Sequence, residues 1–175
     1  MKKIMALSGS KNTQSVNYKL VNLLINDFEN VWLKDLRTLE IPVYSQDLER
    51  EHGIPNAITD LINEMKVYDA FIVNTNEHNG YLSAFFKNII DWMSRADSNF
   101  MGNKPVFLIS SSPGAKGGAS ALESLSKLMG YFGGEVEAKI ALPNVYDHLS
   151  KDLSSIVATL EMNALSKRIL TFVNS

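Results

Sequence analysis

A dense group of hydrogen-bond donors occupies residues 8–17 of the chain. The segment contains four hydroxyl side chains and one lysine, and a helical pattern follows it directly. Free N–H groups at a helix N-terminus, hydroxyl donors and the positive end of the helix dipole can converge on a phosphate without a metal ion. A simpler interpretation, in which Thr13 or Ser15 only caps the helix, stays open. The candidate phosphate-binding residues are Ser8, Ser10, Lys11, Asn12, Ser15, Val16 and Asn17.

Two further polar loops each lie between a short apolar run and a helical pattern. Residues 74–80 offer amide, carboxylate and imidazole groups that can hydrogen-bond the edge of a polar heterocycle. Residues 110–118 contain three glycines and a proline, which let the backbone approach a flat ligand closely. Either loop could be an ordinary connection, and the Asn79-Gly80 pair alone favours a plain turn. The candidate ligand-binding residues in these loops are Asn76, Glu77, His78, Asn79, Gly80, Ser111, Pro113, Gly114, Gly117 and Gly118.

The elements that would position these loops alternate between short apolar runs and helical spacing, which is typical of successive β-α units. We predict strands at 4–7, 31–36, 70–73, 106–109 and 136–142, helices at 16–28, 55–65, 85–93, 122–132 and 153–173, and a long loop over 38–53. Right-handed crossovers and helices on both faces then favour a flavodoxin-like α/β three-layer sandwich with a five-stranded parallel sheet in the order 2-1-3-4-5. Its switch point lies between the first and third strands, so the three polar loops would surround one crevice.

Composition narrows the class of protein further. With 175 residues, 45% hydrophobic and 21% charged, the chain fits a single domain spanning 1–175. The net charge of -2 and the scattered lysines and arginines argue against a nucleic-acid partner. No cysteine is present, and neither a signal peptide nor a long apolar segment is found, so we expect a cytoplasmic protein without a membrane partner.

Several catalytic classes lack their sequence signatures. The chain has no P-loop, no dinucleotide fingerprint and no G-x-S-x-G motif, and the missing cysteines exclude a cysteine-based phosphatase. The three histidines, His52, His78 and His148, fall in unrelated segments without metal-ligand spacing. We therefore expect no metal and no catalytic side chain, although serine triads assemble in space and are excluded less firmly.

The first and third loops resemble those of the NAD(P)H-dependent FMN reductases. Gly9-Ser10 followed by Ser15-x-Asn17 is similar to the family's phosphate loop, usually G-S-x-R-x-x-S-x-N, and the 113–118 segment is similar to its glycine-rich flavin loop. Where the family usually carries arginine, this chain has Asn12 with Lys11 beside it. The resemblance implies FMN as the cofactor, with a weaker or displaced charge contact to its phosphate.

The middle of the chain resembles the same family more specifically. Glu77-x-Asn79 and the stretch from Lys87 through Arg95 are similar to the family pattern P-E-Y-N followed by L-K-N-A-I-D-W-x-S-R. Asn76 and His78 stand where the family favours proline and tyrosine, and Tyr81 stands where serine is common. These departures affect the surface that would meet the flavin ring and its electron donor, so FMN binding is better supported than a choice of nicotinamide.

The resemblance implies an oxidoreductase that passes electrons from NADPH or NADH through FMN to a small acceptor such as a quinone, an azo compound or free flavin. It also implies a homodimer or homotetramer, with Asp91, Trp92 and Arg95 near a subunit contact, although Trp92 could simply pack in the core. The alternative is a flavodoxin-like carrier or FMN-binding module that shuttles electrons without NAD(P)H turnover. Carriers tend to be more acidic than this chain, which favours the reductase.

Overall fold

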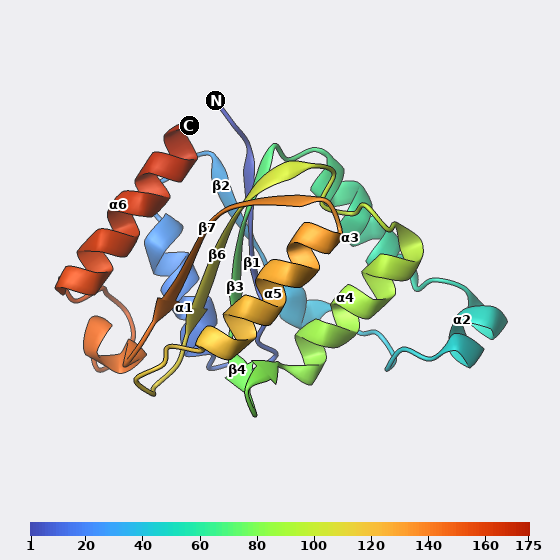
Figure 1. The fold of residues 1–175 in the computed structure, drawn as a ribbon, viewed down its shortest axis with the longest axis horizontal. Coiled ribbons are helices and arrows are strands. Elements are labelled where there is room, and N and C mark those ends of the chain that lie inside the picture. Colours follow the sequence, from blue (N-terminus) through green and yellow to red (C-terminus); the bar gives the residue numbers. More distant parts are fainter.

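The computed structural model describes residues 1–175 without a gap and contains five parallel strands in one sheet (Figure 1). The sheet order is β2-β1-β3-β6-β7, which is the predicted 2-1-3-4-5 order once the short β4–β5 hairpin is set aside. The strands are β1 (Ile4–Ser8), β2 (Val31–Lys34), β3 (Ala70–Thr75), β4 (Glu77–His78), β5 (Tyr81–Leu82), β6 (Lys104–Ser111) and β7 (Gly134–Leu142). The predicted flavodoxin-like α/β fold is confirmed.

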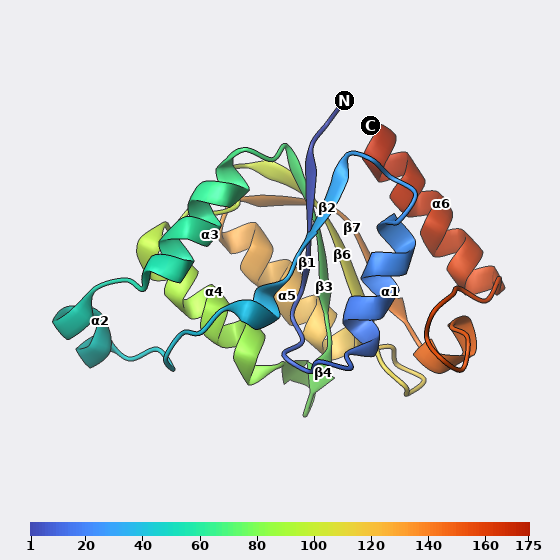
Figure 2. The same ribbon diagram turned by 180° about the vertical axis from the view of Figure 1, so that it is seen from behind.

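Helices cover both faces of this sheet. Three of them lie on one face, and α1 and α6 lie on the other, as the reverse view shows (Figure 2). The short α2 extends away from the rest of the molecule, and none of its residues is buried. The helices are α1 (Val16–Ile25), α2 (Gln46–His52), α3 (Asn56–Lys66), α4 (Ala84–Ala96), α5 (Ala119–Tyr131) and α6 (Leu160–Asn174), with short 3-10 helices η1 (Leu36–Thr38) and η2 (Val145–His148).

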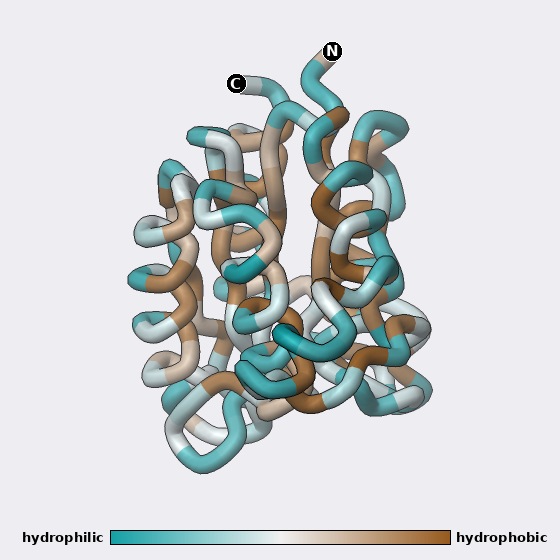
Figure 3. The backbone as a smooth tube through the Cα atoms, turned by 90° about the vertical axis from the view of Figure 1, so that its right-hand side faces the viewer, coloured by the Kyte–Doolittle hydropathy of each residue, from teal (hydrophilic) through white to brown (hydrophobic).

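Strand alternation divides the core into two clusters. On β1, Met5 and Leu7 face α3, α4 and α5, whereas Ile4 and Ala6 face α1 and α6. The inner strands are buried on both faces, so they appear in the sequence as continuous apolar runs. The helices α1, α3, α4, α5 and α6 each place one apolar face on the sheet, and the hydropathy along them alternates accordingly (Figure 3). Trp92 belongs to this core, where its Nε1 donates to the carbonyl of Pro42 at 2.9 Å.

Several predicted boundaries are wrong. The helix predicted over 16–28 ends at Ile25, and the helix predicted from 122 begins at Ala119. The last helix begins at Leu160, because Asp152 bonds Ser150 and Ser154 in a tight turn and Leu153 has a left-handed φ of 58°. The strand predicted over 31–36 ends at Lys34, because the Asp35 carboxylate caps η1. The segment predicted as a loop over 38–53 contains the helix α2, which the hydroxyl side chain of Ser45 caps at its N-terminus.

Candidate functional site

A cavity of about 500 Å³ opens where β1, β3 and β6 end, and this volume falls within the usual range for small-molecule sites. Five separate segments of the chain contribute to it, so it lies at the predicted switch point. Most of its lining residues are polar. The lining residues are Ser10, Lys11, Asn12, Gln14, Ser15, Val16, Asn17, Asn76, Glu77, His78, Ser83, Ala84, Phe85, Ser111, Ser112, Pro113 and Tyr146.

Loop 1, which we define as residues 9–15, forms one wall and is fixed at its first residue. The hydroxyl of Ser83 donates to the carbonyl of Gly9 at 2.7 Å and accepts from the N–H of Phe86 at 3.1 Å, so one side chain caps α4 and holds the loop. A Cβ on residue 9 would lie 2.3 Å from Cδ1 of Phe86. Glycine is therefore required where loop 1 crosses the start of α4.

Loop 1 and the first turn of α1 present backbone donors without acceptors. Only two backbone N–H groups donate to an acceptor within the loop. The N–H of Ser15 donates to the carbonyl of Asn12, and the N–H of Gln14 donates to the side-chain oxygen of Asn12. Unpaired N–H groups gathered at a helix N-terminus are the arrangement that binds phosphates and other anions. The amides that donate to no protein group are those of Ser10, Lys11, Asn12, Thr13, Val16 and Asn17.

A buried polar layer lies beside this helix terminus. Asn17 accepts a hydrogen bond from the hydroxyl of Ser111 at 2.7 Å, and its amide nitrogen makes no hydrogen bond within the protein. Ser8 on β1 lies opposite Asn74 on β3 in the register of the parallel strands, and the two residues are 2% and 0% exposed. The Ser8 hydroxyl and both polar atoms of the Asn74 side chain have no partner. Unsatisfied groups this deeply buried are costly, which suits a site completed by a ligand or ordered water.

The second predicted loop forms a hairpin. Asn79 and Gly80 occupy its turn with left-handed φ values of 52° and 77°, and neither residue lines the cavity. Glu77 accepts a hydrogen bond from the N–H of Ala121 at 3.0 Å, so its carboxylate is fixed at the N-terminus of α5. Asn76 and His78 line the cavity and contact each other at 3.0 Å.

In the third loop the glycines and the polar residues have different surroundings. Ser111 and Pro113 line the cavity, but Gly114, Gly117 and Gly118 do not. A Cβ on Gly117 would lie 2.6 Å from the carbonyl carbon of Leu142, so this glycine allows the loop to pack on the end of β7. Their direct contact with a ligand remains a prediction, as it does for Ser8, Asn79 and Gly80.

Sequence reasoning missed several lining residues and one buried one. Ser83 could have been found as a hydroxyl residue directly before an apolar helix, which is a typical N-cap. Asn74 could have been found as a polar residue ending an apolar strand. Tyr146 has no such signal, because the chain returns to the cavity through η2. The missed lining residues are Gln14, Ser83, Ala84, Phe85, Ser112 and Tyr146.

Three further observations concern metal ligands, membrane-spanning helices and basic side chains at the cavity. No group of three histidine, aspartate or glutamate side chains lies close enough to hold a metal ion. No helix is long and apolar enough to cross a bilayer. Lys11 is the one lysine or arginine on the cavity wall, and its amine donates to the carbonyls of Arg37 and Leu39 at 2.6 and 3.2 Å.

Comparison with known proteins agrees with the architecture. A family model described as NADPH-dependent FMN reductase matches residues 2–164. A quinone reductase of Escherichia coli is 32% identical over 90 residues, which cover 51% of this chain and 48% of that protein.

Two solved structures show the same fold. The flavoenzyme NAD(P)H:(acceptor) oxidoreductase of Paracoccus denitrificans superposes with a TM-score of 0.78 at 24% identity, covering 99% of this chain and 96% of that one. An FMN-dependent NADH-azoreductase of Bacillus anthracis, solved in complex with FMN, gives a TM-score of 0.68 at 11% identity and covers all of both chains.

Proposed function

The chain belongs to the NADPH-dependent FMN reductase family, and from this premise we propose that it passes electrons from NADPH or NADH through FMN to a small acceptor. Membership in this family makes the protein an oxidoreductase with FMN as its cofactor. The observation that carries the proposal is the set of unpaired backbone N–H groups at the start of α1, on the wall of the switch-point cavity. This is the site chemistry that a flavin phosphate requires.

The residues of the cavity fit FMN in two respects. The donors of loop 1 and α1 suit its dianionic phosphate, and the amide, imidazole and carboxylate groups of residues 76–78 suit the hydrogen-bonding edge of its ring. Bound FMN would supply the redox chemistry itself, taking a hydride from the nicotinamide and passing electrons to the acceptor. The protein therefore needs no metal and no nucleophile for this reaction.

The protein's own residues would bind, orient and shield the cofactor. Ser10, Ser15 and Asn17 with the neighbouring amides would hold the phosphate, and Ser83 keeps their loop in place. The carboxylate of Glu77 is already fixed at the N-terminus of α5. Strand β4, which carries Glu77, would therefore present its polar groups to the edge of the flavin ring in a rigid arrangement. The apolar lining residues Phe85 and Pro113 would exclude water from part of the ligand surface.

The acceptor class is a finer part of the proposal. The Escherichia coli relative is a quinone reductase and the Bacillus anthracis structure is an azoreductase, so quinones and azo compounds are the acceptors we propose, together with free flavin. We also propose that residues 1–175 form one flavodoxin-like FMN-binding domain, and that the protein is a cytoplasmic homodimer or homotetramer. Sedimentation of the purified protein would test the assembly.

A steady-state assay tests the electron flow. Purified protein should retain flavin absorbance after FMN is added and the unbound FMN is removed by desalting, and should then oxidise NADPH or NADH faster than FMN alone in the presence of a quinone or an azo dye. Omitting FMN is the control. Protein that binds flavin but gives no turnover above the blank with either nicotinamide would contradict the reductase and favour an electron carrier.

A further inference from the structure

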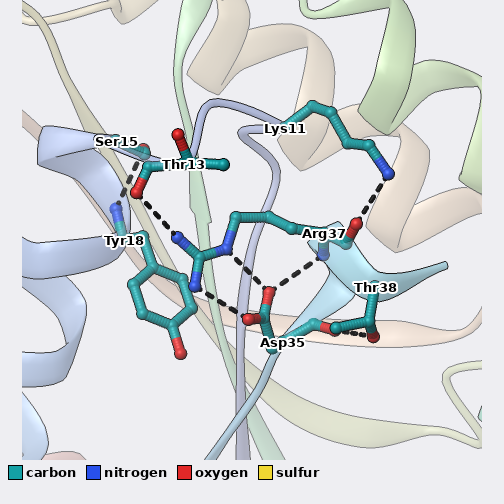
Figure 4. A network of polar contacts seen from close by, with 7 residues as sticks. All are labelled: Lys11, Thr13, Ser15, Tyr18, Asp35, Arg37 and Thr38. Carbon is teal, nitrogen blue, oxygen red and sulfur yellow. Dashed lines mark hydrogen bonds and ion pairs between the residues drawn. The ribbon is translucent and has the colours of Figure 1, made fainter.

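Arg37 lies outside the cavity, in η1 after β2, yet its guanidinium contacts loop 1 (Figure 4). It forms a two-point pair with Asp35, with Nε to Oδ1 at 2.8 Å and Nη2 to Oδ2 at 2.7 Å. Its third nitrogen, Nη1, donates to the carbonyl of Thr13 at 3.3 Å. Its Cζ atom lies 3.7 Å from the ring centroid of Tyr18, which is within cation-π range.

These contacts fall on both sides of the α1 N-cap. Thr13 precedes the cap residue Ser15, and Tyr18 follows it and donates its N–H to the Ser15 hydroxyl at 3.2 Å. One guanidinium therefore joins the loop, the first turn of the helix and the end of β2. Lys11 adds a second link to the same segment, because its amine donates to the carbonyl of Arg37.

Charge compensation indicates that Arg37 does not serve as a free cation for the ligand. The hydrogen bond from Arg37 lowers the pKa of Asp35, and the same bond raises the pKa of Arg37. Both groups are therefore charged at neutral pH, and the pair carries no net charge. Its effect on a bound anion must come mainly through the position of loop 1.

Loop 1 needs such external support because it has little internal structure. Its unpaired N–H groups are available to a ligand only because they are not used in local hydrogen bonds, and fixing each residue of a free loop costs conformational entropy. A loop that is ordered before binding does not pay this cost on association.

We infer that Arg37 is a positioning residue for the FMN phosphate: together with Asp35 and Lys11, it orders loop 1 so that its backbone N–H groups face the cavity. The inference rests on the proposed function, since it assumes that loop 1 binds the phosphate. The inference predicts that removing Arg37 lowers the affinity for FMN but not for riboflavin, because riboflavin lacks the phosphate that loop 1 binds.

The test compares the dissociation constants of FMN and riboflavin, measured by fluorescence titration. Arg37→Ala should weaken FMN binding about tenfold, the order expected when binding must fix one more backbone residue, and should leave riboflavin binding unchanged. Arg37→Lys, which keeps the charge but not the planar fork of three nitrogens, should retain part of the FMN affinity. Arg50→Ala is the matched control, because Arg50 pairs only with Asp47 on the exposed α2.

Hydrogen exchange without flavin gives a second reading of the same inference. The hydrogen-bonded amides of Gln14 and Ser15 in loop 1 should exchange faster in Arg37→Ala than in the wild type, and amides of α6 should not change. If Arg37→Ala fails to fold by circular dichroism, Arg37→Lys carries the test, and it should raise the dissociation constant of FMN severalfold without affecting riboflavin.

The outcomes separate the two proposals. If the wild type prefers FMN to riboflavin and Arg37→Ala keeps the same preference, the role of Arg37 is overturned and the FMN site stands. Equal weakening of FMN and riboflavin would also overturn it, since the effect would then be general. A wild type that shows no preference for FMN would overturn both the phosphate site and the inference.

Discussion

Two serine-rich segments of this protein each lead into a helix with a hydroxyl N-cap, but their hydrogen bonding differs. In residues 150–155, Asp152 accepts from the hydroxyls of Ser150 and Ser154 at 2.6 and 2.8 Å, and Ser150 accepts from the N–H of Ser155 at 3.0 Å. The N–H groups of Ser150, Leu153, Ser154 and Ser155 and the hydroxyls of Ser150 and Ser154 all donate to acceptors within the segment. Loop 1 has no carboxylate, and six amides in or beside it find no acceptor in the protein.

The difference shows that a high density of donors does not by itself predict a binding site. An acceptor within the segment turns the donors inward, whereas its absence leaves them for a ligand. The hydrogen bonds from Ser150 and Ser154 lower the pKa of Asp152 from 3.8 to about 2, so this acceptor is negatively charged throughout the physiological range. In loop 1, the phosphate of FMN would take the place of that carboxylate.

The largest predicted effect comes from removing donors in loop 1 and α1. Ser15→Ala with Asn17→Ala should weaken FMN binding about a hundredfold, since two hydrogen bonds to a charged group are lost. The fold should persist, because the apolar core residues of α1 are unchanged. Losing the Ser15 cap costs about 1 kcal/mol, and leaving the buried Ser111 hydroxyl without its Asn17 acceptor costs about 1–3 kcal/mol more. Fluorescence titration and thermal unfolding provide the two measurements.

The matched control for that double variant lies in the other segment. Ser150→Ala with Ser154→Ala also removes two polar side chains, from a turn that does not line the cavity, and should leave FMN affinity unchanged. The contrast between the two segments would be lost if both double variants bound FMN as tightly as the wild type.

A smaller effect should follow from giving loop 1 an internal carboxylate. The Asn12 side chain accepts from the N–H of Gln14 at 2.9 Å, and Asn12→Asp can keep this bond while adding a negative charge. Repulsion should weaken FMN binding about tenfold and leave riboflavin unaffected, with the loss decreasing at high salt. An equal loss for both flavins would point to a distorted loop and not to charge.

The smallest effect concerns the turn formed by residues 150–155. Because its folded-state pKa is depressed, Asp152 stabilises the 150–155 turn above its ordinary pKa, and this contribution is lost as the pH falls from about 4 through about 2. The amide resonances of Ser154 and Ser155 should follow this titration by NMR. Asp152→Asn should remove the transition without changing FMN affinity, and a midpoint at the ordinary value of 3.8 would contradict the bonding described for this turn.

Much of the fold could be predicted from sequence because hydrophobic periodicity reflects burial directly. The continuous apolar runs that begin at Ile4 and Ala70 predict central strands of a parallel sheet. The helical spacing of apolar residues near Phe86 predicts a helix that packs on a face of that sheet. The start of the last helix was not predicted, because the apolar residues Leu153 and Ile156 continue its pattern into a turn that side-chain hydrogen bonds determine.

The candidate site was only partly predictable for a related reason. Loop 1 has a local signature, so Ser10, Ser15 and Asn17 could be identified and they do line the cavity. Contacts between distant segments leave no such signature. Arg37 reaches Thr13 only because β2 lies beside β1 in the sheet.

A crystal structure of the protein with FMN tests the central claim most directly. The account predicts that phosphate oxygens accept hydrogen bonds of about 2.7 to 3.2 Å from backbone N–H groups of loop 1 and of the first turn of α1, Val16 and Asn17 included. Arg37 should keep its contacts with Asp35 and Thr13 in that complex. A phosphate bound elsewhere, with these amides left to solvent, would contradict the account.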